Sequence, residues 1–299
     1  MLLNPLWNES CGDLPLEPWQ ADSAEGLVSR LWAQTAREAN LRRADEIYRA
    51  VLERAGNTER ESRGFAADES RQARLGVFLS TDVSLCTIAV QPFLPQGLLI
   101  EPRELQNQLA KVRVLRPQNL PSLYEETIPG GLLFASSRSG LYYECEQIYV
   151  NGLIHAVHEC AYNRENHKIL YLGGVAERLV LVLQAARNLF RLVDFQGEFT
   201  VTVKFDGVGG CFILPLLSHD ISYGLRDPLR ALLASFRWDK TFFLNNAQAE
   251  EAQLGMQDNG ELQEFGISLI QDICWGLGHG RTERAHVQAC LKQFGLGSS

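Results

Sequence analysis

The sequence predicts an α+β fold, mainly an antiparallel sheet with a covering amphipathic helix, plus a helical N-terminal segment and a helical C-terminal region. Three observations within residues 131–217 predict it. Two strand-like segments meet at Asn151-Gly152, a dipeptide typical of hairpin turns. A long helical pattern follows, and then a second strand pair flanks the glycine cluster at 207–210. With 299 residues and 45% apolar content, the chain can bury a sizeable core.

Composition divides the chain into three regions: an N-terminal arm and helical segment (1–74), an α+β sheet domain (75–220) and a helical C-terminal region (221–299). The first 20 residues contain three prolines together with Trp7 and Trp19, which favours an extended arm. Large aromatic side chains on such an arm are typical of docking, either within the chain or onto a partner. Trp7 and Trp19 are therefore the predicted partner-binding residues.

A capping box at Asp22 and Glu25 predicts the start of the first helix. The helical pattern runs to about Arg54, and Gly56-Asn57 is expected to end it, with a loop over 57–63. The residues available for its apolar stripe are Leu27, Leu31, Ala44, Ile47 and Val51.

After Gly76 the apolar residues change from helical spacing to the alternation typical of strands. Strands are predicted at 77–82 and 84–93, followed by a helix at about 102–113 that begins with Pro102, and by a strand near 132–136.

The hairpin at Asn151-Gly152 predicts a register. A two-residue type I′ turn pairs residues whose numbers sum to 303, so that Cys145 lies opposite His158. One face of the strand pair would then carry Cys145, His158 and Cys160, and the other face His155 and Glu159.

The second half begins with a predicted helix from Gly173 to about Asp194, whose apolar stripe should cover the sheet. A strand at 199–205, a turn at Asp206-Gly207 and a returning strand at 211–217 should follow. Asp227-Pro228 predict a further helix start, and helices are expected near 247–255, 260–275 and 282–294.

The three soft ligands Cys145, His158 and Cys160 form the best metal candidate. Zinc needs about four ligands in tetrahedral geometry, or three and water. No C-x-x-C knuckle occurs here, and side chains on neighbouring strand positions stand parallel, so the favoured interpretation is a half-buried sheet face without metal. No cofactor is predicted.

Other motifs give little support for catalysis. His155 and Glu159 could serve in acid–base chemistry, but no third group that orients the imidazole is implied. The cluster Gly207-Val208-Gly209-Gly210 lies between strands and opens no helix, which favours a turn over a phosphate site.

Arg281 and His286 have the R-x4-H spacing found in the helical HEPN ribonucleases. About one match of this kind is expected by chance in a chain of this composition. The pair is therefore the alternative catalytic site, and a surface Arg and His are the favoured interpretation.

Charge and cysteine content suggest a compartment and limit the partners. A net charge of −8 and the absence of Lys and Arg from residues 241–280 argue against a general nucleic-acid surface. The segment with Arg103, Lys111, Arg113 and Arg116 could form a local patch, although a solvated helix face is favoured. Seven scattered cysteines predict reduced thiols in the cytoplasm, and no apolar run is long enough for a membrane span.

Segments 75–92, 101–134 and 141–217 resemble the region that follows the AlbA_2 (Schlafen-like) domain in bacterial regulators and defence proteins. The resemblance rests on GLLF (131–134), YVNGLIHAV (149–157) and FTVTVKFDGVGGCFI (199–213). Residues 1–74 do not resemble the AlbA_2 domain itself, and His155 stands where the family tends to have an acidic residue. No catalytic residue carries over.

The resemblance implies a scaffold or sensing module in an antiviral or mobile-element assembly. We therefore expect a non-catalytic subunit that binds a protein partner or a second copy of itself. Nucleic acid would be reached only through a partner or a local patch. The alternative is a nucleic-acid-acting effector, a HEPN-like ribonuclease using Arg281 and His286.

Overall fold

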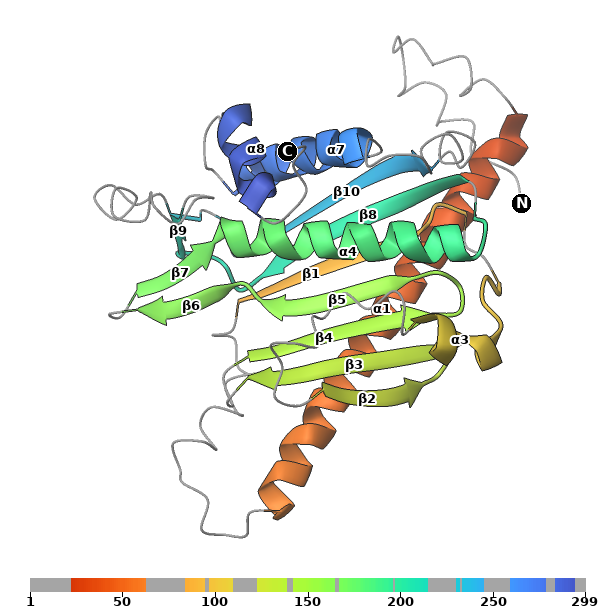
Figure 1. Cartoon of the computed structure of the whole chain (residues 1–299), viewed down its shortest axis with the longest axis horizontal. Helices are drawn as coiled ribbons and strands as arrows, with labels where there is room; N and C mark the ends of the chain where they lie inside the picture. The colour runs from red at the N-terminus through yellow and green to blue at the C-terminus, as the bar shows by residue number, and fades with distance from the viewer. Residues whose placement is uncertain are drawn as a thin grey trace, which may run out of the picture.

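The protein is an α+β fold, as predicted, built around a seven-stranded antiparallel sheet in the order β10-β8-β1-β5-β4-β3-β2. The structure is a computed structural model that describes residues 23–62, 84–94, 97–109, 123–138, 142–164, 167–195, 197–214, 230–231, 233–244, 259–277 and 283–293. Helices α4, α7 and α8 lie on one face of the sheet, and the long helix α1 crosses the other (Figure 1).

The strands of the large sheet are β1 (Leu85–Pro92), β2 (Leu123–Ile128), β3 (Gly131–Arg138), β4 (Tyr142–Tyr149), β5 (Ile154–Glu159), β8 (Gly197–Asp206) and β10 (Ser235–Leu244). A three-stranded sheet is formed by β6 (Ala161–Arg164), β7 (His167–Tyr171) and β9 (Phe212–Leu214). The helices are α1 (Ser23–Ser62), α3 (Pro102–Leu109), α4 (Leu172–Leu192), α7 (Asn259–Gly276) and α8 (Arg284–Gln293).

Helix α4 forms close to its predicted bounds, and its apolar stripe is the centre of the main core. Leu179, Leu183 and Phe190 are buried against the sheet. Phe190 packs on Phe199 of β8, with ring centroids 5.6 Å apart. The spacing of three and four residues thus places one continuous apolar face on β1, β5 and β8.

The C-terminal helices α7 and α8 also form close to prediction, and they share this core with the sheet through Ile267, Ile270 and Val287. Gly276 lets α7 approach β10, because a Cβ at this position would lie 2.2 Å from the Phe236 ring. Residues 235–244, placed in a helical region by the sequence, form the edge strand β10 instead. The predicted domain boundaries stay a prediction.

Helix α1 is longer than predicted. It continues through Gly56-Asn57 to Ser62, where a loop was expected. A single glycine costs a helix about 1 kcal/mol, which strong helix formers such as Arg54 before it and Glu59 after it can offset. Its ends project past the sheet (Figure 1).

The face of α1 that meets the sheet matches the predicted stripe in part. Ala44 is buried and Ile47 packs against the sheet, as predicted, and Ala33 and Tyr48 are buried beside them. Leu31, also placed in the stripe, is 53% exposed. The two alanines allow α1 to approach the sheet closely.

The β4–β5 connection has three residues, Val150 to Gly152, and not two as predicted. The Gly152 amide donates to the Tyr149 carbonyl (3.0 Å), and the Tyr149 amide donates to the Leu153 carbonyl (2.9 Å). Gly152 has a φ of +84°, whereas Asn151 lacks the positive φ that a type I′ turn requires. The register therefore slips by one: Cys145 pairs with Val157, and Gln147 pairs with His155.

The returning strand after Asp206-Gly207 does not pair with β8. Instead β9 lies parallel to β7, with Ile169 opposite Phe212. Strand β8 is already flanked by β1 and β10 on its two sides, so no edge is left for β9. Among the described residues, no helix is both long and apolar enough to cross a membrane.

Candidate functional site

The face of the sheet beneath α1 carries most of the buried polar side chains in the described residues. Because side chains alternate along a strand, the register places one set of positions on β1, β4, β5 and β8 toward α1. Its buried polar members are Thr87, Gln91, Gln147, His155, Thr200 and Thr202. Helix α1 meets two of these groups directly, His155 through the Asp45 side chain and Gln147 through the Ala44 carbonyl. This interface is therefore the candidate functional site.

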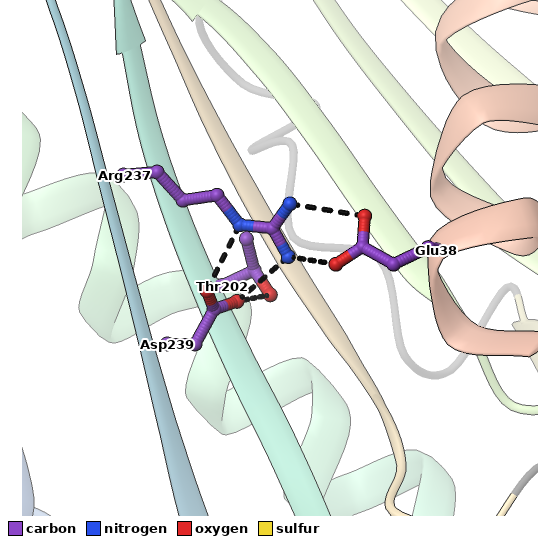
Figure 2. A network of polar contacts seen from close by, with 4 residues as sticks. All are labelled: Glu38, Thr202, Arg237 and Asp239. Atoms are coloured by element: carbon purple, nitrogen blue, oxygen red, sulfur yellow. Dashed lines mark hydrogen bonds and ion pairs between the residues drawn. The ribbon is translucent and has the colours of Figure 1, made fainter. Parts of the chain in front are cut away.

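Arg237 of β10 is the centre of a polar network that joins Glu38, Asp239 and Thr202 (Figure 2). Its guanidinium donates to both carboxylate oxygens of Glu38 on α1, at 3.0 and 2.5 Å. It also donates to both oxygens of Asp239, at 2.9 and 3.1 Å. Thr202 of β8 donates to Asp239 at 2.6 Å, which fixes the orientation of that carboxylate.

This double bidentate arrangement matches the planar fork of arginine. The hydrogen bonds to Glu38 raise the pKa of Arg237 above its usual value, so the charge is held at every accessible pH. The Arg237 and Glu38 side chains are 39% and 37% exposed, so solvent screens the pair and its main effect is to set the position of α1 on the sheet.

His155 of β5 forms the second link to α1. Its Nε2 lies 3.0 Å from Oδ1 of Asp45, and the ring is 1% exposed. Burial alone would raise the pKa of Asp45, but the hydrogen bond and charge of His155, followed by Lys204 and Arg49, lower it below its usual value. Asp45 is the orienting group that the sequence left unidentified, because it lies 110 residues away in the chain.

Gln147, the cross-strand neighbour of His155, forms the third link. Its Nε2 donates to the Ala44 carbonyl on α1 at 3.1 Å, and its Oε1 accepts a hydrogen bond from the Tyr149 hydroxyl at 2.5 Å. Burial raises the pKa of both Tyr149 and the neighbouring Cys145 thiol, the latter to about 12. These groups are neutral hydrogen-bonding partners at physiological pH.

Arg37 forms the fourth link, at the end of β1. Its guanidinium lies 4.4 Å from the centroid of the Phe93 ring and donates to the Phe93 carbonyl. Four polar contacts therefore fasten one stretch of α1, residues 37–45, across the strands from β10 to β4. Such an arrangement positions a helix on the sheet.

The predicted set of Cys145, His158 and Cys160 is not brought together. The slipped register places Cys145 on the α1 face, among Ala44, Tyr48 and Leu133. Cys160 lies in the opposite core with α4. Within the described part of the chain, no three His, Cys, Asp or Glu side chains are grouped so that they could hold a metal ion. The predicted cross-strand contact of Cys145 with His158 is therefore wrong.

His158 instead projects into the apolar core, opposite Cys86 of β1. The ring is 6% exposed and neither nitrogen has a hydrogen-bond partner. Burial, followed by the charge of Arg178, lowers the pKa of His158 to about 3. Burial raises the pKa of Cys86 and Cys160 above the usual range, so these thiols are protonated and poorly nucleophilic.

Glu159, the other acid–base candidate, lies at the end of β5. Burial raises its pKa to about 7, against the lowering effect of Lys168. The register places it on the same face as His155, which is engaged by Asp45. Lys168 donates to the Gly207 carbonyl at 3.2 Å, in the glycine turn.

Most of the remaining predicted site residues lie in parts of the chain that the structure does not describe. Trp7, Trp19 and Arg281 lie outside the described residues. His286 lies in α8, but its side chain is not described. The Arg281 and His286 pair therefore stays a prediction.

Helices α1 and α7 expose tryptophan side chains, and Leu192 at the end of α4 is 45% exposed. Trp275, in the last turn of α7, is 75% exposed. On α1, Val28, Leu31 and Trp32 are exposed at a helical spacing of three and four residues. The sequence predicts Leu31 in the apolar stripe, because apolar residues at helical spacing indicate a buried face, and it makes no prediction for Val28, Trp32 or Trp275.

Comparisons of this chain with family models, curated proteins and solved structures gave no match.

Proposed function

We propose that this protein is a non-catalytic scaffold or sensing subunit of a bacterial multi-protein assembly, of the antiviral or mobile-element kind that the sequence resemblance implies. The observation that carries this proposal is the exposure of large apolar side chains on helices over both faces of the sheet. Trp275 stands on α7, and Trp32 stands on α1. Exposed tryptophans are typical binding-energy centres of protein interfaces.

The interior of the molecule supports the same proposal. The described groups best suited to chemistry are used to hold the fold: His155 fastens α1, and His158 and the thiols near it lie in the apolar core. A rigid sheet with helices fixed on both sides is suited to presenting surfaces to partners.

The test is isolation of the tagged full chain from its host, with stoichiometry measured by mass photometry. We expect a defined complex, and we expect Trp275→Glu to weaken it at least tenfold, since a central interface tryptophan contributes about 2 kcal/mol or more. Leu192→Glu, at the end of α4, is the matched control for an added surface charge. Loss of the complex in both variants, or in neither, would argue against the surface on α7.

The competing function, a helical ribonuclease, predicts a different result. Arg281→Ala and His286→Ala would each abolish metal-independent RNA cleavage, because general acid–base help contributes about 10²–10⁴-fold. For a scaffold, both variants keep full biological activity. RNA cleavage by the purified chain that disappears with either substitution would overturn the proposal.

A further inference from the structure

The outward surface of α1 has a definite chemical order. Opposite the buried Ala33, Ala44 and Tyr48, one side of the helix is exposed between Val28 and Arg49. We call it the outer α1 face, and its residues are Val28, Leu31, Trp32, Thr35, Ala39, Arg42, Arg43, Glu46 and Arg49.

The apolar and the basic residues of the outer α1 face are separated along the helix. The first turns carry Val28, Leu31 and Trp32, which are 57%, 53% and 60% exposed. The later turns carry Arg42, Arg43 and Arg49 with one acid, Glu46. Glu38 and Asp45, the other acids between Arg30 and Arg49, are bound to Arg237 and His155 at the sheet. The surface is thus apolar toward the N-terminus and basic beyond it.

Residues 1–22, which lie outside the described residues, have the complementary composition. They contain four carboxylates, Glu9, Asp13, Glu17 and Asp22, and no Lys or Arg. They also contain seven Leu and Trp residues, including Trp7 and Trp19. This acidic and apolar segment ends at the first residue of α1.

We propose that residues 1–22 dock on the outer α1 face of the same chain, running antiparallel to the helix. The distances fit this direction. Trp19 lies four residues before Ser23, about 13 Å of extended chain, while Leu31 and Trp32 lie about 12–14 Å along the helix from Ser23. Asp13 is about 33 Å of extended chain from Ser23, and Arg42 and Arg43 lie about 30 Å along the helix.

The length of the segment and the order of its residues therefore both fit the outer α1 face. Trp19 reaches the apolar turns of the helix, and Asp13 reaches the basic turns. The connection also favours the same chain over a second copy, because a short tether gives an effective concentration of about millimolar.

This contact goes beyond the proposed function and does not depend on it. It has one consequence for that function: a partner that binds Trp19 or Trp32 must first separate them. The arm would then act as a built-in competitor for the surface on α1, while the surface on α7 stays open.

The test places a photocrosslinking residue, p-benzoylphenylalanine, at position 19 of the full chain. We expect irradiation to give a crosslink to residues 28–35, in a product of monomer mass. Leu31→Glu combined with Trp32→Glu should lower the yield about tenfold, the change that ~1.4 kcal/mol produces. Both side chains are exposed, so helix content measured by circular dichroism should stay unchanged.

Trp275→Glu is the control, because it replaces an exposed tryptophan of α7 by a negative charge away from α1 and should leave the yield unchanged. Arg42→Glu with Arg43→Glu should lower the crosslink yield at low salt, and Asp13→Lys should restore part of it. A crosslink in a product of twice the mass would show that the occupant is a second copy. A crosslink elsewhere, or a yield independent of Leu31 and Trp32, would also overturn the proposal.

Discussion

The two faces of the central sheet are held by different forces. On the α4 face, β1, β5 and β8 present apolar side chains such as Ile88, Ile154 and Val203, and α4, α7 and α8 bury them. On the α1 face, a smaller apolar cluster that includes Leu133, Leu153 and Val157 lies beside threonine, glutamine and histidine side chains. Asp45 and Glu38 of α1 bind His155 and Arg237 on this face.

This difference means that one face mainly stabilises the domain and the other mainly fixes where α1 lies. Burial of apolar area is strong and has no direction, so the α4 face supplies the stability of the domain. Hydrogen bonds and ion pairs add little net free energy but demand a fixed geometry. The α1 face therefore determines where α1 lies more than whether the sheet folds, and three predictions test this contrast.

The largest expected effect comes from Leu179→Ala, at a fully buried position of α4. The cavity left in this core should lower the free energy of unfolding by about 2–5 kcal/mol. Leu31→Ala, the same change at the exposed turn of α1, should alter it by less than about 0.5 kcal/mol. Urea denaturation measures both, and equal effects would contradict the contrast between the faces.

The second effect is an acid sensitivity that originates in the apolar face. His158 has a folded-state pKa of about 3, below the ordinary value of 6.5. Between these values only the unfolded chain takes up the proton, so stability falls as the pH falls through this window. The loss should reach about 2 kcal/mol at pH 5.

The measurement compares the shift in urea midpoint between pH 7.5 and pH 5 in the parent protein and in His158→Leu. The variant should lose most of the His158 contribution, because it has no imidazole to protonate. An equal shift in both proteins would show that other groups are responsible.

The smallest effect concerns the polar face. Glu38→Gln and Arg237→Ala should each loosen α1, and a double-mutant cycle should give a coupling of about 0.2–1 kcal/mol, since both side chains are over one third exposed. Hydrogen exchange should rise in α1 while α4 stays protected. Simultaneous loss of protection in both helices would mean that α1 is part of the main folding unit.

The same contrast explains what could be predicted from the sequence. Apolar periodicity is a local signal, and it located α4, α7 and α8 closely and gave the fold class. The polar face depends on pairs far apart in the chain, such as Asp45 with His155, and no local pattern identifies such partners.

The failed register has a local cause. Asn151-Gly152 fits a two-residue turn, but the same glycine can also occupy the left-handed position of a three-residue loop, as Gly152 does. The choice between the two turns depends on which side chains of β5 must face α4. The two-residue turn puts His158 and Cys145 on the same face of the sheet, whereas in the structure His158 faces α4 and Cys145 faces α1. The extension of α1 past Gly56 reflects strong helix formers that offset a weak stop signal.

The ion pair of Glu38 with Arg237 joins residues 199 positions apart, and this separation has a consequence for synthesis on the ribosome. Helix α1 is made early, whereas β10 emerges only after most of the chain. At about 5–20 residues per second, α1 must wait roughly 10–40 s for this partner. A predominantly apolar helix would be prone to aggregation during that wait. The charged character of α1 lets it remain solvated until the sheet is complete, so its docking is a late step of folding.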